Sequence, residues 1–463
     1  MDSEHSSAVK VIAFSLLFSI AQLAFLLVLA RALGNAGYAA FSVNMAIAVT
    51  VSALSSEWLR LVMARYSGVR GLRLRASLLR TSLVWVLGLA SLPIALGLIL
   101  AATAPAALVS PLDILAIAML AGGATLAECT ATYLRFNART DTFLRFSGSR
   151  IAASGLAMVA AALADRSASS AGIAFAVASA GVSAIWIVRY WVPEKGRVDH
   201  RRLLRFVSIG FGLASSSIFT SFLLTATRLG LRNSLGATQS AATLLAIDLA
   251  SRGQSVLGNA FTTWSAKSIY DAAHARRSNR ADPAMWRATI VFMALWSCLG
   301  VGGTLVAMLA PLLVLGRDAY GGTGWVVALN LAGLVVLMAR IYSIDLLLSA
   351  FARFRTIALA SLPLALAIPA FWVFPGAAAW VLPSGVAASI LVILAATWRE
   401  RLVRRGLLLI IASAATVGGL YQAAAMLIEA IAPAAAWFAL AALAAHLVYV
   451  AATSLSARKQ LRG

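Results

Sequence analysis

Charged residues are scarce in this chain of 463 residues: Asp, Glu, Lys and Arg make up only 12% of it, whereas 61% of the residues are hydrophobic. A globular chain carries about twice that charged fraction. Long polar stretches are also missing, and the longest one covers only residues 265–287. This composition excludes a soluble enzyme of two or three domains and leaves no room for a nucleotide-binding domain.

The residues that usually hold metals and cofactors are few and scattered. The chain has two cysteines and four histidines, and it lacks both HExxH and the phosphate-binding pattern GxxxxGK. We therefore expect no metal, no cofactor and no catalytic residue, so the protein is predicted not to be an enzyme. The net charge of +22 does not indicate a nucleic-acid partner, because the basic residues lie in short breaks between apolar runs and form no continuous basic face.

Apolar runs dominate what remains. A bilayer-spanning helix needs roughly 20 apolar residues, and the chain predicts an all-α polytopic membrane protein with about 14 transmembrane helices. The predicted helices cover 11–30, 38–63, 82–109, 112–134, 151–164, 170–191, 206–227, 238–263, 289–315, 324–347, 357–374, 379–397, 407–430 and 434–455.

The basic residues alternate between successive breaks, as the preference of Lys and Arg for the cytoplasmic side requires. With the N-terminus inside, 31 of the 38 basic residues fall in cytoplasmic segments and only five in the opposite ones. One missed helix would swap the two sides for every later loop. We therefore predict a multi-pass protein of the bacterial inner membrane with both termini in the cytoplasm.

A weak internal repeat appears at an offset of 202 residues. Leu33-Gly34 matches Leu235-Gly236, and an Ala-Ala pair follows each at the same distance. Duplicated transporters often show such symmetry. The repeat predicts an N-terminal lobe of six helices at 1–200, a C-terminal lobe of six helices at 201–400 and two extra helices at 401–463.

The stretch 29–41 reads LARALGNAGYAAF, and RLVMARY follows at 60–66. It resembles the first helical hairpin of the Wzx-type polysaccharide flippases, in the multidrug/oligosaccharidyl-lipid/polysaccharide exporter superfamily, where a helix ends in A-R-x-L-G and a Gly-Tyr pair opens the next. The chain departs from that pattern at Asn35 and Ala36, where family members often carry proline and an acidic residue.

This resemblance implies two helical lobes around a cavity that opens alternately to each side. It implies a flippase that moves a polyprenyl-pyrophosphate-linked oligosaccharide outward for polysaccharide biosynthesis, with the lipid-linked oligosaccharide, membrane lipid and other polysaccharide-assembly proteins as partners. Two alternatives stay open. One is a cation-coupled multidrug antiporter of the same superfamily. The other is a membrane-embedded glycan polymerase or ligase, which would need a larger periplasmic loop than this chain provides.

Charges inside the predicted spans cost about 2.5–3.5 kcal/mol each on insertion scales, so each calls for a partner or a function. The functional interpretation is that the arginines line an inward-facing vestibule and bind pyrophosphate through their planar fork, while the acids hold them or take up a proton. The candidate substrate-binding residues are Arg252, Arg340, Arg60, Asp248, Glu128 and Glu57.

The structural alternative is that the same charges are neutral ion pairs that fix helix packing or, for Glu57 and Arg60, side chains that extend to the membrane interface. Glu57 with Arg60 and Asp248 with Arg252 have helical spacings that place both members of a pair on one face. Asp345, close to Arg353 at the expected membrane edge, is predicted to be a surface or capping residue.

The topology can be tested with reporter fusions. Fusions after Arg166, Arg232 and Arg317 should report a periplasmic location, and fusions after Arg75, Arg202 and Arg404 a cytoplasmic one. A cytoplasmic signal at Arg232 would mean that the helices of the first half have been miscounted.

Overall fold

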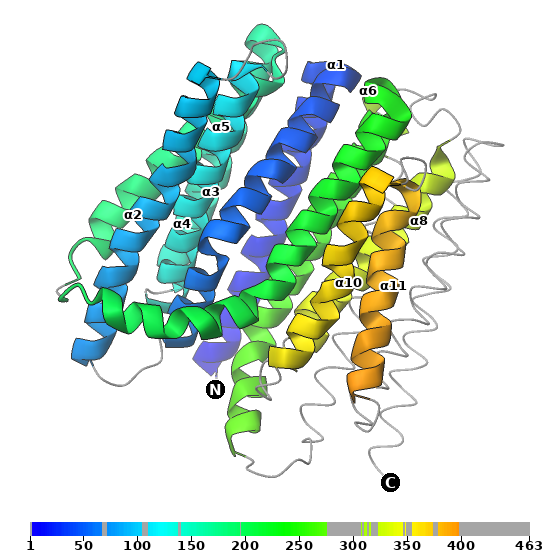
Figure 1. Ribbon diagram of the computed structural model, residues 1–463. Helices are drawn as coiled ribbons and strands as arrows, with labels where there is room; N and C mark the ends of the chain where they lie inside the picture. The colour runs from blue at the N-terminus through cyan, green and yellow to red at the C-terminus, as the bar shows by residue number, and fades with distance from the viewer. Residues whose placement is uncertain are drawn as a thin grey trace. The chain divides into compact units, whose positions relative to one another are not determined.

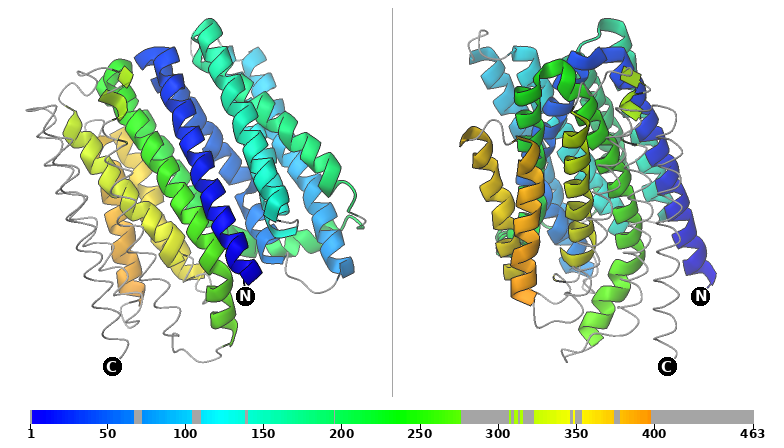
Figure 2. Two further views of the ribbon diagram at one scale, coloured as in Figure 1. Left: turned by 180° about the vertical axis from the view of Figure 1, so that it is seen from behind. Right: turned by 90° about the vertical axis from the view of Figure 1, so that its right-hand side faces the viewer.

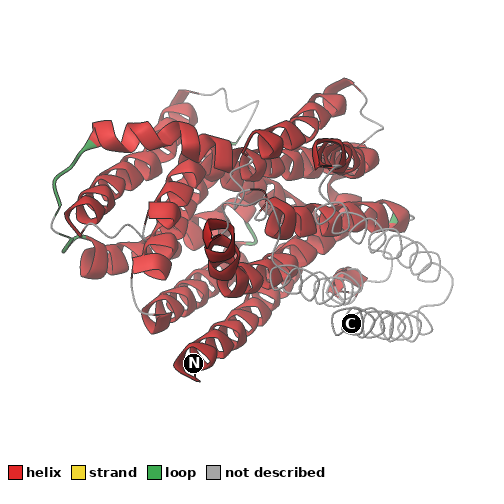
Figure 3. Ribbon diagram, turned by 90° about the horizontal axis from the view of Figure 1, so that it is seen from below, coloured by secondary structure: helices red, strands yellow, loops and turns green. Residues whose placement is uncertain are grey.

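The computed structural model describes residues 2–66, 72–103, 110–137, 140–194, 196–275, 323–345, 354–373 and 378–397, with a few single positions between 307 and 348. Within these ranges every element is a helix and no strand occurs, as Figure 3 shows. The all-helical fold predicted from the apolar runs is therefore confirmed for the described part of the chain.

Nine α-helices and two π-helical segments make up the described elements (Figure 1). They are α1 Asp2–Tyr66, α2 Leu72–Thr103, α3 Pro111–Asn137, α4 Thr140–Asp165, α5 Ala168–Trp186, η1 Ile187–Trp191, α6 His200–Ala275, α8 Gly324–Ala339, η2 Arg340–Asp345, α10 Phe354–Val373 and α11 Ala378–Thr397.

Seven helices among the described residues are long and apolar enough to cross a membrane. The longest of these, Ile20–Ala64, contains 45 residues, more than twice the length that one span needs. The predicted helices 407–430 and 434–455 lie outside the described residues, as does most of 289–315. The total of about 14 helices therefore stays a prediction.

Two glycines interrupt the longest helices. Gly34 in α1 has φ 66° and ψ −177°, and Gly236 in α6 has φ 76° and ψ 166°. A Cβ at either position would meet no atom within 4 Å, so the left-handed backbone and not crowding favours glycine there. Figures 1 and 2 show α1 rising from the N-terminus, reversing its direction and returning. These glycines separate the helix pairs predicted at 11–30 and 38–63 and at 206–227 and 238–263.

The start of α4 differs from the prediction. The sequence suggested a short span at 151–164, whereas α4 begins eleven residues earlier, at Thr140. Asp141 in the first turn favours a helix start because its negative charge faces the positive end of the helix dipole. The prediction was wrong because it began the helix only after Arg150, the last charge of the preceding break.

The chain divides into two compact units, Met1–Leu229 and Gly230–Gly463. The division falls inside α6, so the first half of this helix belongs to unit 1 and the second half to unit 2. The domain boundaries predicted from the repeat, at 200/201 and 400/401, stay predictions.

Unit 1 is held together by close helix contacts at small residues. A Cβ on Gly122 of α3 would lie 2.6 Å from the carbonyl oxygen of Ala90 in α2, and one on Gly155 of α4 would overlap the ring of Phe25 in α1. Small residues let helix backbones approach closely in a bilayer, where apolar burial alone does not drive helices together. Aromatic side chains also belong to this core. The rings of Tyr133 and Trp191 are stacked, with their centroids 4.6 Å apart.

The link between α5 and α6 is fastened to α2. The indole of Trp191 donates to the carbonyl of Leu79 at 2.9 Å, the hydroxyl of Ser77 donates to the carbonyl of Arg197 at 2.7 Å, and the indole of Trp85 donates to the ring of His200 at 2.9 Å. In Figure 1 the start of α6 lies across the lower end of the neighbouring helices. The first half of α6 is thereby held within unit 1.

In unit 2, α11 packs against both α8 and α10. Gly333 of α8 lies against the backbone of Pro383 in α11, and the amide of Asn330 donates to the carbonyl of Ala379 at 3.3 Å. These contacts hold the segment that carries η2.

The contact of Gly122 gives a test of this packing. Gly122→Ala should destabilise the protein by about 1–3 kcal/mol, because the added methyl would collide with a backbone oxygen that cannot move alone. Gly88→Ala on α2 is the control, since a Cβ there would meet nothing within 4 Å. The thermal midpoint in detergent should fall for the first variant and not for the second. Equal midpoints would contradict the close approach of α2 and α3.

Candidate functional site

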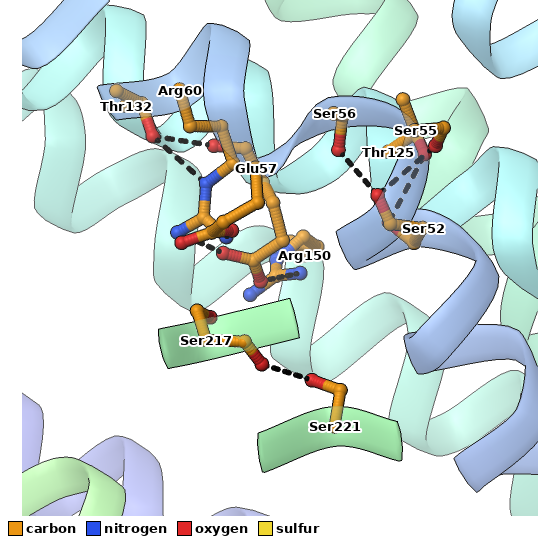
Figure 4. Close-up of polar contacts among 11 residues, drawn as sticks. Ser52, Ser55, Ser56, Glu57, Arg60, Thr125, Thr132, Arg150, Ser217 and Ser221 are labelled. Carbon is orange, nitrogen blue, oxygen red and sulfur yellow. Dashed lines mark hydrogen bonds and ion pairs between the residues drawn. The ribbon is translucent and has the colours of Figure 1, made fainter. Parts of the chain in front are cut away.

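Four charged side chains from three helices meet in unit 1, and we call Glu57, Arg60, Glu128 and Arg150 the four-charge cluster (Figure 4). Nη1 of Arg60 lies 2.7 Å from Oε2 of Glu57, one helical turn away on α1. Nη2 of Arg60 lies 3.3 Å from Oε2 of Glu128 on α3. The other carboxylate oxygen of Glu128 lies 3.5 Å from Nη1 of Arg150 on α4. Glu128 therefore bridges two arginines.

The cluster is only partly enclosed. Side-chain exposure is 13% for Glu57, 30% for Arg60, 40% for Glu128 and 20% for Arg150. Two acids and two bases cancel in formal charge, which lowers the cost of holding them within apolar helices. Their partial exposure leaves them able to meet a ligand.

Hydroxyl groups on α1 join this helix to α3 and to α6. The hydroxyls of Ser52 on α1 and Thr125 on α3 lie 3.0 Å apart, and those of Thr50 on α1 and Thr225 on α6 lie 2.7 Å apart. Nε of Arg60 donates to Thr132 at 3.4 Å. Hydrogen bonds of this kind fix the relative positions of helices in a bilayer, so α1 and α3, which carry three of the four charges, are held together by polar contacts.

Arg150 was missing from the predicted site. The sequence analysis placed it in a cytoplasmic break, whereas the structure places it ten residues into α4 and in contact with Glu128. The threonine and acidic residue at the start of α4, Thr140 and Asp141, were the signal that could have moved the helix start upstream.

Asp248 and Arg252 lie one turn apart on the second half of α6, in unit 2, and both are partly buried. Among the ion pairs within 4.0 Å that join described residues, none connects these two side chains. The hydroxyl of Ser251 donates to the carbonyl of Asp248 at 3.1 Å. A binding role for either residue stays a prediction.

Arg340 is fully buried in unit 2, with 0% exposure, at the first residue of η2. Its Nε lies 3.4 Å from Asp345, its Nη1 donates to the carbonyl of Ala360 at 3.3 Å and to the hydroxyl of Ser389, and its Nη2 donates to Ser361 at 3.1 Å. These partners join η2, α10 and α11. The vestibule role predicted for Arg340 stays a prediction, and the geometry gives it a role in packing.

One further expectation can be compared with the structure. Asp345 was predicted to be a surface or capping residue, which is wrong, because its exposure is 8% and it pairs with Arg340. Asn44 on α1 donates to Asp113 of α3 at 3.1 Å, so it makes an interhelical hydrogen bond. Within the described residues, no group of three or more His, Cys, Asp or Glu could hold a metal ion.

Two solved structures share this fold, and a third gives a lower score. A MATE multidrug transporter, DinF-BH, determined in complex with a ligand, superposes with a TM-score of 0.54 at 13% identity, covering 86% of this chain and 96% of that one. A structure named "protein A" gives a TM-score of 0.60 at 14% identity over 86% and 96% of the two chains. A multidrug resistance MATE family transporter of the MOP superfamily, in an inward-facing conformation, gives 0.49 at 14% identity over 86% and 98%.

The chain matches no protein-family model, and no curated protein matches its sequence. At 13–14% identity the structural likeness shows the fold alone. The described part of the chain therefore has the helical fold of the MATE transporters, and its function has to be argued from its own residues.

The ion pair of Arg340 and Asp345 in η2 gives a test of the packing in unit 2. Asp345→Asn should destabilise the protein by about 3–5 kcal/mol, because it removes a carboxylate that pairs with a fully buried guanidinium. Adding Arg340→Met should recover most of that loss, since the buried positive charge is then removed as well. The measurement is the thermal midpoint of purified protein, with Arg355→Met, at an exposed position of α10, as the control. A single variant as stable as the wild type would contradict the packing role.

Proposed function

We propose that this chain is a secondary membrane transporter that exports a polyprenyl-pyrophosphate-linked oligosaccharide across the bacterial inner membrane. The observation that carries the proposal is the four-charge cluster, in which Arg60 and Arg150 are partly exposed within apolar helices. Polysaccharide-assembly proteins are the partners that this role would require.

A guanidinium suits a pyrophosphate because its planar fork makes two parallel hydrogen bonds to phosphate oxygens and keeps its charge when water is removed. Two such groups, on α1 and α4, are joined through one carboxylate of α3. Nearby serine and threonine hydroxyls, such as those of Ser52 and Thr125, could meet polar parts of a substrate. The two guanidiniums are therefore the groups of the cluster that would contact a phosphate, and the hydroxyls are the groups that would contact sugars.

The energy for transport has to come from outside the chain. The sequence contains no GxxxxGK nucleotide-binding pattern, and no polar stretch is long enough for an ATPase domain. An ion gradient or the asymmetric supply and consumption of substrate on the two sides would drive the cycle.

A cation-coupled multidrug antiporter is the second candidate, and two observations favour it. One structural neighbour is itself a MATE multidrug transporter, and the four-charge cluster also contains two carboxylates, Glu57 and Glu128, that could bind a cation or a proton. Because the cluster is neutral, its composition alone favours neither charge of substrate.

Deletion of the gene separates the two candidates. For a flippase, the cell should lose a surface or secreted polysaccharide and accumulate the lipid-linked repeat unit inside, because the repeat unit cannot cross the bilayer unaided. Lipid extraction followed by mass spectrometry measures that intermediate. Normal glycan together with higher sensitivity to cationic dyes would support the antiporter instead.

A further inference from the structure

The two arginines of the four-charge cluster are held very differently. Arg60 has an ion pair of 2.7 Å with Glu57, a second of 3.3 Å with Glu128 and a hydrogen bond to Thr132. Arg150 has one ion pair, at 3.5 Å, which is longer than a well-formed charged hydrogen bond. Arg150 is the more weakly held of the two.

One hydrogen-bond donor of Arg150 is also unsatisfied. Its Nε is buried and has no hydrogen-bond partner in the described part of the chain. A buried N–H without an acceptor loses its hydration and gains nothing in return. An anion that replaced Glu128 at Nη1 could accept a second hydrogen bond from Nη2, which is the two-pronged geometry that a phosphate accepts from arginine.

Glu128 is the group that such an anion would meet first. It is the most exposed member of the cluster, at 40%, and each of its oxygens faces a different arginine. Turning the carboxylate away from Arg150 would break only the 3.5 Å contact and could preserve the 3.3 Å contact with Arg60. The cluster therefore contains one contact that can be exchanged at small cost.

We propose that Arg150 is the position in this cluster that receives the phosphate of the substrate and that Glu128 occupies this position in its absence. The proposal rests on the proposed function, because it assumes a phosphate-bearing substrate. It adds a residue that sequence analysis did not assign to the site, and it gives Glu128 the role of an internal competitor.

The prediction that distinguishes this role from simple packing is a gain of affinity. Glu128→Gln removes the competing charge but keeps a side chain of similar size, so inorganic pyrophosphate should bind about two- to fivefold more tightly. Arg150→Gln should weaken binding by about tenfold or more, because a charge-assisted contact is lost. Arg150→Lys should give an intermediate result, since the ammonium keeps the charge and lacks the fork.

The control is Asp113→Asn. Asp113 lies on the same helix as Glu128, but it accepts hydrogen bonds from Asn44 and Ser169 and takes no part in the four-charge cluster. The substitution Asp113→Asn removes one negative charge from α3 and changes no ion pair of Arg60 or Arg150. Affinity for pyrophosphate should stay within about twofold of the wild type, whereas a general effect of net charge would raise it in both acid variants.

The measurement is calorimetric titration of full-length protein in nanodiscs of neutral phosphatidylcholine. The titration has three arms. The first uses inorganic pyrophosphate as a free phosphate, and the second uses farnesyl pyrophosphate as a prenyl-linked one. The third uses discs that contain phosphatidylglycerol, which supply a phosphate as a membrane headgroup. Thermal midpoints are measured for every variant, and Glu128→Asp serves as a second variant that keeps the charge but shortens the bridge.

The outcomes separate the two proposals. If pyrophosphate binds equally well to wild type and Arg150→Gln, or if Glu128→Gln only lowers the thermal midpoint without tighter binding, the role of Arg150 and Glu128 is wrong. The proposed flippase would still stand if deletion of the gene traps the lipid-linked repeat unit. If deletion leaves the glycan normal, the flippase is wrong, whether or not Arg150 binds pyrophosphate.

Discussion

An ionised side chain inside hydrocarbon has to find its counter-charge within the protein, and the polar architecture of this chain follows from that constraint. The structure meets it in two ways. Arg340 is paired and hydrogen-bonded to partners on η2, α10 and α11 and is fully buried. Arg60 and Arg150 are paired with carboxylates across α1, α3 and α4 and stay partly exposed. The first arrangement holds helices together, and the second can also exchange partners.

Much of the fold could be predicted from the sequence because the bilayer imposes long apolar runs. The spans that became α3, α5 together with η1, α10 and α11 were placed within about three residues of their observed ends. The break at Gly34 and its counterpart at Gly236 could be inferred from a short repeated motif, since few residues other than glycine adopt positive φ readily. These features depend on local composition and backbone geometry, which a single sequence contains.

The site was harder to predict because it depends on contacts between helices. The pairing of Glu57 with Arg60 follows from their spacing on one helix, and the structure shows it. The link to Glu128 and Arg150 depends on how α1, α3 and α4 pack. Asp345 was misjudged for a related reason. Its distance along the chain from Arg353 suggested the membrane edge, whereas the π-helical η2 brings it to Arg340.

The reversal at Gly34 also has a consequence for how the protein is made. The two halves of α1 are joined through a single glycine in left-handed conformation, with no extended polar loop between them. A nascent chain of this kind has almost no hydrophilic segment to carry through the translocation channel, and exposing the junction alone in hydrocarbon would leave backbone groups without partners. The first two spans are therefore suited to partition into lipid together, as a preformed hairpin.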